Sequence, residues 1–243
     1  MRNESHSNFQ EVIESLGFDY KKLAVSLDGG SFTLLELEIS PIESLEQAES
    51  DFVSSESSMY LNCIPNAKRA IVGQMDQILY SFGFNPFRWN VRKKMEKLNE
   101  LGVLTPTILR KVSKVRNLLE HNYSKPSKNE VELALDIASL FVLSNIALFN
   151  FFESTLIFRN DENVSENDIF SGITIGLERN HTEVFWRLYG YKNSDNVLSC
   201  KLYKDDPFFT ILVKLCTALQ LRYKVEEAFN LLNQTCEKYS SIK

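Results

Sequence analysis

Cysteine, histidine and proline are scarce in this chain, and the common metal and nucleotide motifs are missing. The 243 residues include four Cys, three His and six Pro. The cysteines show no CxxC spacing and are few for the length, so reduced thiols in a cytoplasm are expected. The sequence also has no P-loop, no zinc-ligand spacing and no nucleophile elbow. We therefore predict that the protein uses no metal and no cofactor.

Long apolar runs are lacking as well. No run of about 18 apolar residues appears, and the first residues, MRNESH, are too polar for a signal peptide. An apolar content of 44% in 243 residues is enough for one large or two small domains with real cores. We expect a cytoplasmic protein that does not associate with membranes.

Charge is unevenly distributed behind a net charge of −5. Residues 1–64 hold 3 Lys/Arg and 12 Asp/Glu, residues 65–128 hold 13 and 4, and residues 129–243 hold 11 and 16. Cations interleaved with an aromatic residue suit phosphate contact and base stacking. The residues predicted to bind a polyanion such as RNA are Arg88, Arg92, Lys93, Lys94, Arg110 and Lys114. A solvated helical face neutralised by the acidic N-terminal segment, with Trp89 in the core, is the alternative.

The stretch RNLLEHNY, residues 116–123, places a cation, an amide, an imidazole and a phenol on one predicted helix. The apolar residues of that helix share an arc of roughly 120°: Ile108, Val112, Val115, Leu118 and Leu119. Arg116, Asn117 and His121 fall on the polar side, so His121 is not expected in the core. An imidazole can move protons at neutral pH and a guanidinium matches phosphate oxygens, which indicates phosphodiester chemistry.

This stretch resembles the signature of the HEPN superfamily of helical ribonucleases and nucleotide-associated domains, in which Arg, a polar residue and then His recur at this spacing. The resemblance covers residues 58–155. It implies a metal-independent endoribonuclease of a toxin–antitoxin or antiviral defence system, with Arg116, Asn117 and His121 as catalytic residues. The Tyr two residues after His121, Tyr123, makes the motif similar to that of the toxin branch, whose members pair with small nucleotidyltransferase antitoxins. This similarity implies a nucleotidyltransferase antitoxin as partner, which would adenylylate Tyr123.

A homodimer with facing motif helices is also expected. In-line cleavage needs proton transfer on opposite sides of the phosphorus, and the chain offers one well-placed histidine, His121. A second copy would supply the other, as in the family that the chain resembles.

Two other interpretations remain open. Arg116 and Glu120 stand one turn apart and could simply form a surface ion pair. The helical region could also be a non-catalytic module that binds a nucleotide, RNA or a partner protein, because a fold alone does not fix a function.

Helical patterns dominate the middle of the chain. We predict helices over residues 67–82, 87–101, 106–123 and 129–153, with Ser127 and Glu130 forming a capping box before the last. Four helices with short connections predict a bundle.

Strand patterns lie on both sides of this region. Residues 23–27 and 32–39 predict a hairpin around Asp28-Gly29-Gly30, after a short helix over residues 9–16. Ser40-Pro41 starts an acidic helix or linker. Strands over 172–178, 183–191 and 197–203 precede one long helix from Asp206-Pro207 to about Tyr239.

The predicted fold class is α+β, mainly α: a HEPN-like antiparallel helical bundle with a small β-sheet region built from the N- and C-terminal segments. The predicted domains are 1–57 (α/β segment with hairpin), 58–155 (bundle) and 156–243 (strands plus long helix).

Overall fold

The computed structural model describes residues 23–30, 32–55, 57, 59–105, 109, 126–160, 172–181, 183–192 and 195–240, together with residues 9, 12 and 16. These residues divide between two units. The helical unit comprises Thr33–Asn99 and Leu104–Phe151, and the sheet unit comprises Met1–Phe32, Glu100–Val103 and Phe152–Lys243. The predicted α+β class with mainly helical content is confirmed.

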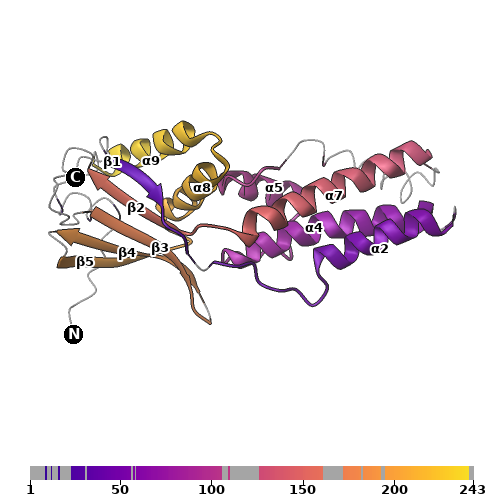
Figure 1. Ribbon diagram of the computed structural model, residues 1–243, viewed down its shortest axis with the longest axis horizontal. Coiled ribbons are helices and arrows are strands. Elements are labelled where there is room, and N and C mark those ends of the chain that lie inside the picture. Colours follow the sequence, from indigo (N-terminus) through magenta and orange to yellow (C-terminus); the bar gives the residue numbers. More distant parts are fainter. Residues whose placement is uncertain are drawn as a thin grey trace. The chain divides into compact units, whose positions relative to one another are not determined.

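Among the described residues, the helical unit contains three long helices and two short ones (Figure 1). Its elements are α2 (Pro41–Ser54), the π-helix η2 (Met59–Cys63), α4 (Ile64–Ser81), α5 (Val91–Glu100) and α7 (Lys128–Asn150). Helices α2, α4 and α7 pack on one another. Leu45, Met75, Ile78 and Val142 are among the residues buried in this unit.

Capping explains where the long helices begin. The Ser40 Oγ accepts a hydrogen bond of 3.1 Å from the Glu43 backbone N–H, and the Ser40 N–H donates to the Glu43 carboxylate at 2.7 Å. Ser127 and Glu130 form the same box at the start of α7, as predicted. These backbone hydrogen bonds lower the pKa of Glu43 and of Glu130.

The sheet unit contains one antiparallel sheet of five strands in the order β1-β2-β3-β4-β5. The strands are β1 (Leu23–Leu27), β2 (Thr155–Asn160), β3 (Gly172–Arg179), β4 (Val184–Lys192) and β5 (Asp195–Tyr203). The last three confirm the predicted strands. Two helices, α8 (Pro207–Leu221) and α9 (Val225–Ser240), follow them.

The predicted N-terminal hairpin is wrong. Strand β1 pairs with β2, more than a hundred residues later, and residues 32–38 form no strand. The Gly29 carbonyl accepts hydrogen bonds from the N–H groups of Ser154 (2.7 Å) and Thr155 (3.0 Å), which holds the chain at the end of β1 beside β2. Leu35 instead bonds to α4, because its N–H donates to the Ser81 Oγ at 2.8 Å.

Two other predicted boundaries differ from the observed ones. The single C-terminal helix is broken after Leu221, since Arg222 and Lys224 adopt left-handed φ values of 49° and 54°. Helix α5 starts at Val91, after a turn in which the Trp89 N–H donates to the Pro86 carbonyl. Residues 33–57 were predicted to belong to an N-terminal α/β segment, but they lie in the helical unit. The sheet was predicted from the N- and C-terminal segments, but four of its five strands come from residues 155–203.

Helix α8 and the Phe9 ring pack on one face of the sheet. The Trp186 indole N–H donates to the Phe209 carbonyl at 3.1 Å, and the Phe9 ring contacts the rings of Phe158 (5.8 Å) and Phe208 (5.0 Å). All four cysteines are buried, and none of them forms a disulfide. Burial raises the pKa of the Cys63 thiol to about 12, with the Asp51 carboxylate as a second cause.

Helix α7 is long and apolar enough to cross a membrane, judged by length and composition alone. In the best 18-residue window of α7 the mean hydropathy is 1.8 and 39% is buried. Core helices of soluble proteins meet the same criterion. Leu133, Leu140 and Leu143 are the large exposed apolar residues of this helix.

A buried ion pair joins α5 to α4. The Lys94 Nζ lies 2.6 Å from Oδ1 and 2.8 Å from Oδ2 of Asp76, and the Lys94 side chain is only 4% exposed. Burial raises the pKa of Asp76 and outweighs the opposing effect of Lys94. Each group is therefore costly to leave alone in this environment.

Removing one partner of this pair should destabilise the helical unit. We expect Asp76→Asn, which leaves a buried ammonium without a counter-charge, to cost about 3–5 kcal/mol in urea unfolding followed by circular dichroism. The double variant Asp76→Leu/Lys94→Met should be at least as stable as wild type, because neither charge is then buried. A single-variant cost below about 1 kcal/mol would show that the pair has no structural importance.

Candidate functional site

The RNLLEHNY motif lies in the connection between α5 and α7, and its residues are outside those that the structure describes. This holds for the predicted catalytic and modification residues, and for two of the predicted RNA-binding residues: Arg116, Asn117, His121, Tyr123, Arg110 and Lys114. The other predicted RNA-binding residues, Arg88, Arg92, Lys93 and Lys94, are described and lie together where α4 leads into α5.

We call this region the α4–α5 surface. It is a set of aromatic and basic side chains from the end of α4, the following turn and the first turns of α5: Tyr80, Phe84, Phe87, Arg88, Trp89, Arg92, Lys93 and Lys97. Gly83, with φ +83°, ends α4, and the Phe84 N–H donates to the Leu79 carbonyl at 3.0 Å. The short turn that follows connects α4 to α5.

Two aromatic residues of the α4–α5 surface are exposed to solvent. Phe87 is 54% exposed and Tyr80 is 41% exposed, with ring centroids 5.3 Å apart. Phe84 and Trp89 form a second pair at 6.3 Å, and both are half-buried. A cluster of exposed aromatic rings is unusual on a protein surface and offers π-faces on which bases can stack.

Lysines lie over the second aromatic pair. The Lys93 Nζ is 4.3 Å from the centroid of the Trp89 ring, and the Lys97 Nζ is 5.3 Å from that of Phe84. Cation–π contact holds these flexible ammonium groups near the rings. Positive charge and stacking surface are therefore presented together.

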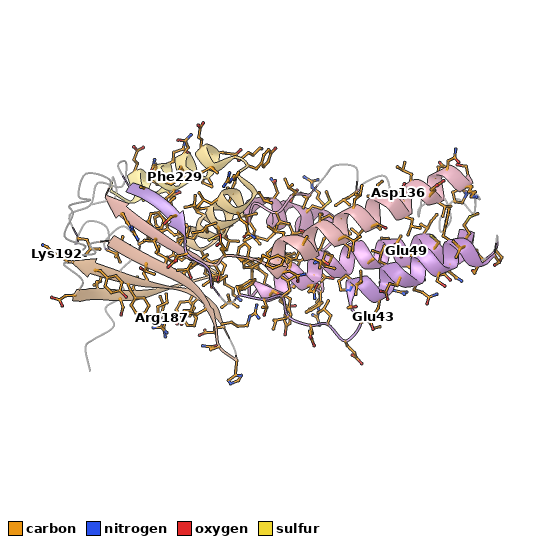
Figure 2. The ribbon with its side chains drawn as sticks, viewed as in Figure 1. Glu43, Glu49, Asp136, Arg187, Lys192 and Phe229 are labelled. Atoms are coloured by element: carbon orange, nitrogen blue, oxygen red, sulfur yellow. The ribbon has the colours of Figure 1, made fainter. Side chains whose placement is uncertain are left out.

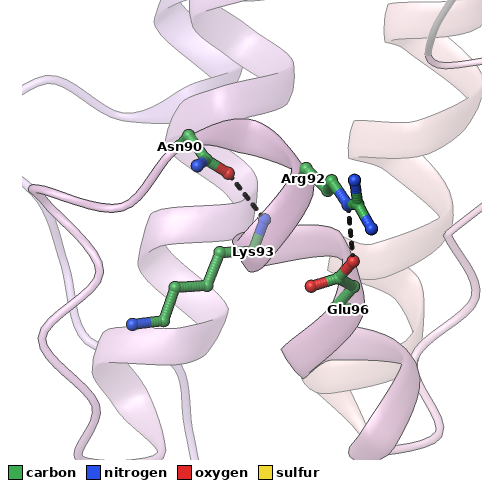
Figure 3. A network of polar contacts seen from close by, with 4 residues as sticks. All are labelled: Asn90, Arg92, Lys93 and Glu96. Atoms are coloured by element: carbon green, nitrogen blue, oxygen red, sulfur yellow. Dashed lines mark hydrogen bonds and ion pairs between the residues drawn. The ribbon is translucent and has the colours of Figure 1, made fainter.

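The start of α5 concentrates positive charge where it opposes the helix dipole. Its first turn contains Arg92, Lys93 and Lys94 and no acidic residue. Cations at a helix N-terminus cost free energy, whereas an anion there gains it. Asn90 caps the helix by accepting from the Lys93 N–H at 2.9 Å (Figure 3). The arrangement suits a bound anion better than an empty surface.

The four described cations differ in what they contact. Arg92 donates to the Glu96 carboxylate at 2.8 Å, one turn further along α5 (Figure 3). A hollow of about 390 Å³ adjoins this pair and is bordered, among the described residues, by Val91, Arg92, Met95 and Glu96. Arg88 and Lys93 have no carboxylate within 4 Å in the described part of the chain.

Lys94 does not belong to the α4–α5 surface. Its side chain is buried and its ammonium group forms an ion pair with Asp76, so it cannot reach a phosphate. The reason is helical periodicity: α5 turns Lys94 toward α4 while its neighbour Lys93 points outward. The sequence run of three cations is thus divided between surface and core.

Sequence reasoning also missed part of this surface. Tyr80, Phe84, Phe87 and Lys97 were not among the predicted binding residues. The signal for them is the aromatic-rich stretch FGFNPFRW at residues 82–89, of which the prediction used only Arg88 and Trp89.

The described residues contain no group of three or more His, Cys, Asp or Glu side chains that could hold a metal ion. No protein-family model matches this chain, and no curated protein or solved structure matches it either.

Adjacent lysines provide a matched test of the α4–α5 surface. We expect Lys93→Met to weaken binding of a 2′-O-methyl RNA oligonucleotide and to reduce the slope of log affinity against log salt by about 0.7, which corresponds to one lost phosphate contact. The double variant Asp76→Leu/Lys94→Met should leave the slope unchanged, because Lys94 is buried and neither partner is left without a counter-charge. Equal effects of Lys93→Met and of this double variant in a filter-binding assay would contradict the assignment.

Proposed function

We propose that this protein is a metal-independent endoribonuclease that resembles HEPN toxins. The observation that carries the proposal is the RNLLEHNY motif at residues 116–123, which lies between α5 and α7 of a helical unit. The exposed rings and cations of the α4–α5 surface support it, because they suit single-stranded RNA. A role in a toxin–antitoxin or antiviral defence system follows from the same resemblance.

The proposed reaction is attack of an RNA 2′-hydroxyl on its own 3′-phosphate. The bond from O2′ to phosphorus forms and the bond from phosphorus to O5′ breaks. One His121 imidazole removes the proton of the 2′-hydroxyl, and a second delivers a proton to the leaving O5′. The Arg116 guanidinium stabilises the negative charge that develops at phosphorus, and Asn117 orients the imidazole or binds phosphate.

Substitutions in the motif should separate catalysis from folding. We expect His121→Ala and Arg116→Ala each to abolish cleavage of labelled RNA while the melting temperature changes little, because both residues are predicted on a polar helix face. His181→Ala, which removes an exposed histidine of the sheet unit, is the matched control and should cleave like wild type. Cleavage should also persist in EDTA, and a requirement for Mg²⁺ would contradict this mechanism.

A non-catalytic module is the second candidate. The α4–α5 surface favours it, since stacking and phosphate contact need no catalytic residue. Such a module would bind RNA with equal affinity in the wild type and the His121→Ala variant and would cleave in neither form.

The homodimer forms part of the proposal, because each copy offers one His121. An apolar stripe on α7 supports association of two copies: Leu133, Leu140, Leu143 and Ala147 are all exposed. Their spacing of seven, three and four residues is that of a helix that packs on another helix. Tyr123 would be the position that a nucleotidyltransferase antitoxin adenylylates, so that added phosphate blocks the RNA phosphate site.

Charge placed on this stripe should disrupt the dimer. We expect Leu140→Glu to convert a dimer into a monomer in light scattering at assay concentration, and to reduce cleavage together with dimer content. Glu132→Gln, an exposed change on the same helix, should leave the dimer intact. A wild-type protein that is monomeric and still cleaves RNA would contradict a site built from the His121 of two copies. Binding of liposomes through α7 would contradict the use of this apolar stripe as a dimer interface.

A further inference from the structure

The two faces of the five-stranded sheet are chemically different. Strand residues alternate between faces, so Trp186, Leu188 and Gly190 of β4 lie on the buried side. Arg187, Tyr189 and Tyr191 are half-exposed on the other side. Figure 2 shows Arg187 on the side of the sheet away from α9, which carries Phe229.

We call this second side the tyrosine face. The strand register places six residues of three neighbouring strands on it: Thr174 and Gly176 of β3, Arg187, Tyr189 and Tyr191 of β4, and Lys201 of β5. Tyr189 stands between two short side chains, opposite Thr174 on one strand and Ser199 on the other. The residues directly opposite Tyr189 on both neighbouring strands are therefore small.

The two tyrosine rings form a stacking platform. Their centroids are 6.5 Å apart with an interplanar angle of 41°. A sheet face with aromatic rings is one of the ways in which proteins bind single-stranded RNA, since unpaired bases can stack on the rings.

Positive charge lies next to these rings in an arrangement that costs stability. Arg187 and Lys201 are directly opposite each other on β4 and β5, and like charges at such positions destabilise a sheet. Both lie over the Phe185 ring, at 5.3 Å and 4.9 Å. Glu178 pairs with Arg187 at 2.9 Å, whereas Lys201 has no carboxylate within 4 Å in the described part of the chain. A bound phosphate would offset this repulsion.

A glycine in the middle of β3 is not explained by packing. Gly176 has no positive φ, and among the described residues a Cβ built on it would meet only the Thr155 Oγ1, at 4.0 Å. Glycine weakens a strand interior, and where neither backbone nor neighbours require it, it often marks close approach of a ligand. Gly176 is directly opposite Arg187, so the free space adjoins the cations.

We infer that the tyrosine face binds a single-stranded RNA segment, with bases stacked on Tyr189 and Tyr191, phosphates at Lys201 and Arg187, and backbone passing over Gly176. Three independent observations fit this one ligand: the two tyrosine rings, the opposed cations, and a glycine that packing does not require. Only the choice of RNA over single-stranded DNA rests on the proposed function. This surface belongs to the sheet unit and shares no residue with the motif or with the α4–α5 surface.

The test measures binding in the His121→Ala background, so that cleavage does not interfere. We expect Gly176→Val and Tyr189→Ala to weaken binding of a fluorescent single-stranded RNA about tenfold or more. Gly176→Val should keep or raise the melting temperature, because valine favours strands. Tyr223→Ala is the matched control: Tyr223 is an exposed tyrosine of the sheet unit with Lys224 over its ring at 5.6 Å, and its loss should leave affinity unchanged.

The outcomes are distinguishable from those of the proposed function. Binding that depends on Tyr189 in a protein that never cleaves RNA would support the tyrosine face and reject the ribonuclease. Cleavage by wild type combined with unchanged RNA affinity of Tyr189→Ala and of a folded Gly176→Val would overturn the inference alone. Equal affinity for single-stranded DNA would overturn the choice of RNA, and photocrosslinks of thiouridine-containing RNA to β4 peptides would support the site directly.

Discussion

The pairing of β1 with β2 is the constraint on which the described architecture depends. These strands are far apart in the sequence, and the residues of the helical unit lie between them along the chain. Closing so long a loop costs entropy, which the hydrogen bonds of the β1–β2 ladder and of the Gly29 carbonyl must offset. The helical unit is thereby an insertion in a sheet unit, whose remaining strands follow as a simple meander.

Each of the two units has a surface that suits a polyanion. The α4–α5 surface combines the exposed Phe87 and Tyr80 rings with lysines held over other rings, and the tyrosine face combines Tyr189 with opposed cations. Both pair aromatic area with positive charge, although the chain as a whole is acidic. Local placement of charge, and not net charge, therefore supports an RNA-related function.

Two adjacent lysines at the start of α5 have different roles, because only one of them has a buried partner. Lys94 and Asp76 join two helices, and the cost of separating them fixes α5 against α4. Lys93, its neighbour in sequence, is left outside with its ammonium over Trp89. The position of the α4–α5 surface thus depends on an ion pair that is not part of this surface.

The sequence by itself determined the elements whose signals are local. Capping boxes at Ser40 and Ser127, the glycine after α4 and the alternation in β3 to β5 all act within a few residues, so these boundaries could be predicted. The function that the RNLLEHNY stretch suggests stays a prediction, because its residues are outside those described.

Only the tertiary structure decided which strand β1 pairs with, which of the adjacent lysines is buried, and which face of β4 is exposed. The physical reason is that these outcomes depend on contacts between distant segments. Asp76 lies a helix away from Lys94, and Lys201 meets Arg187 only through strand register, so no local pattern records either neighbour.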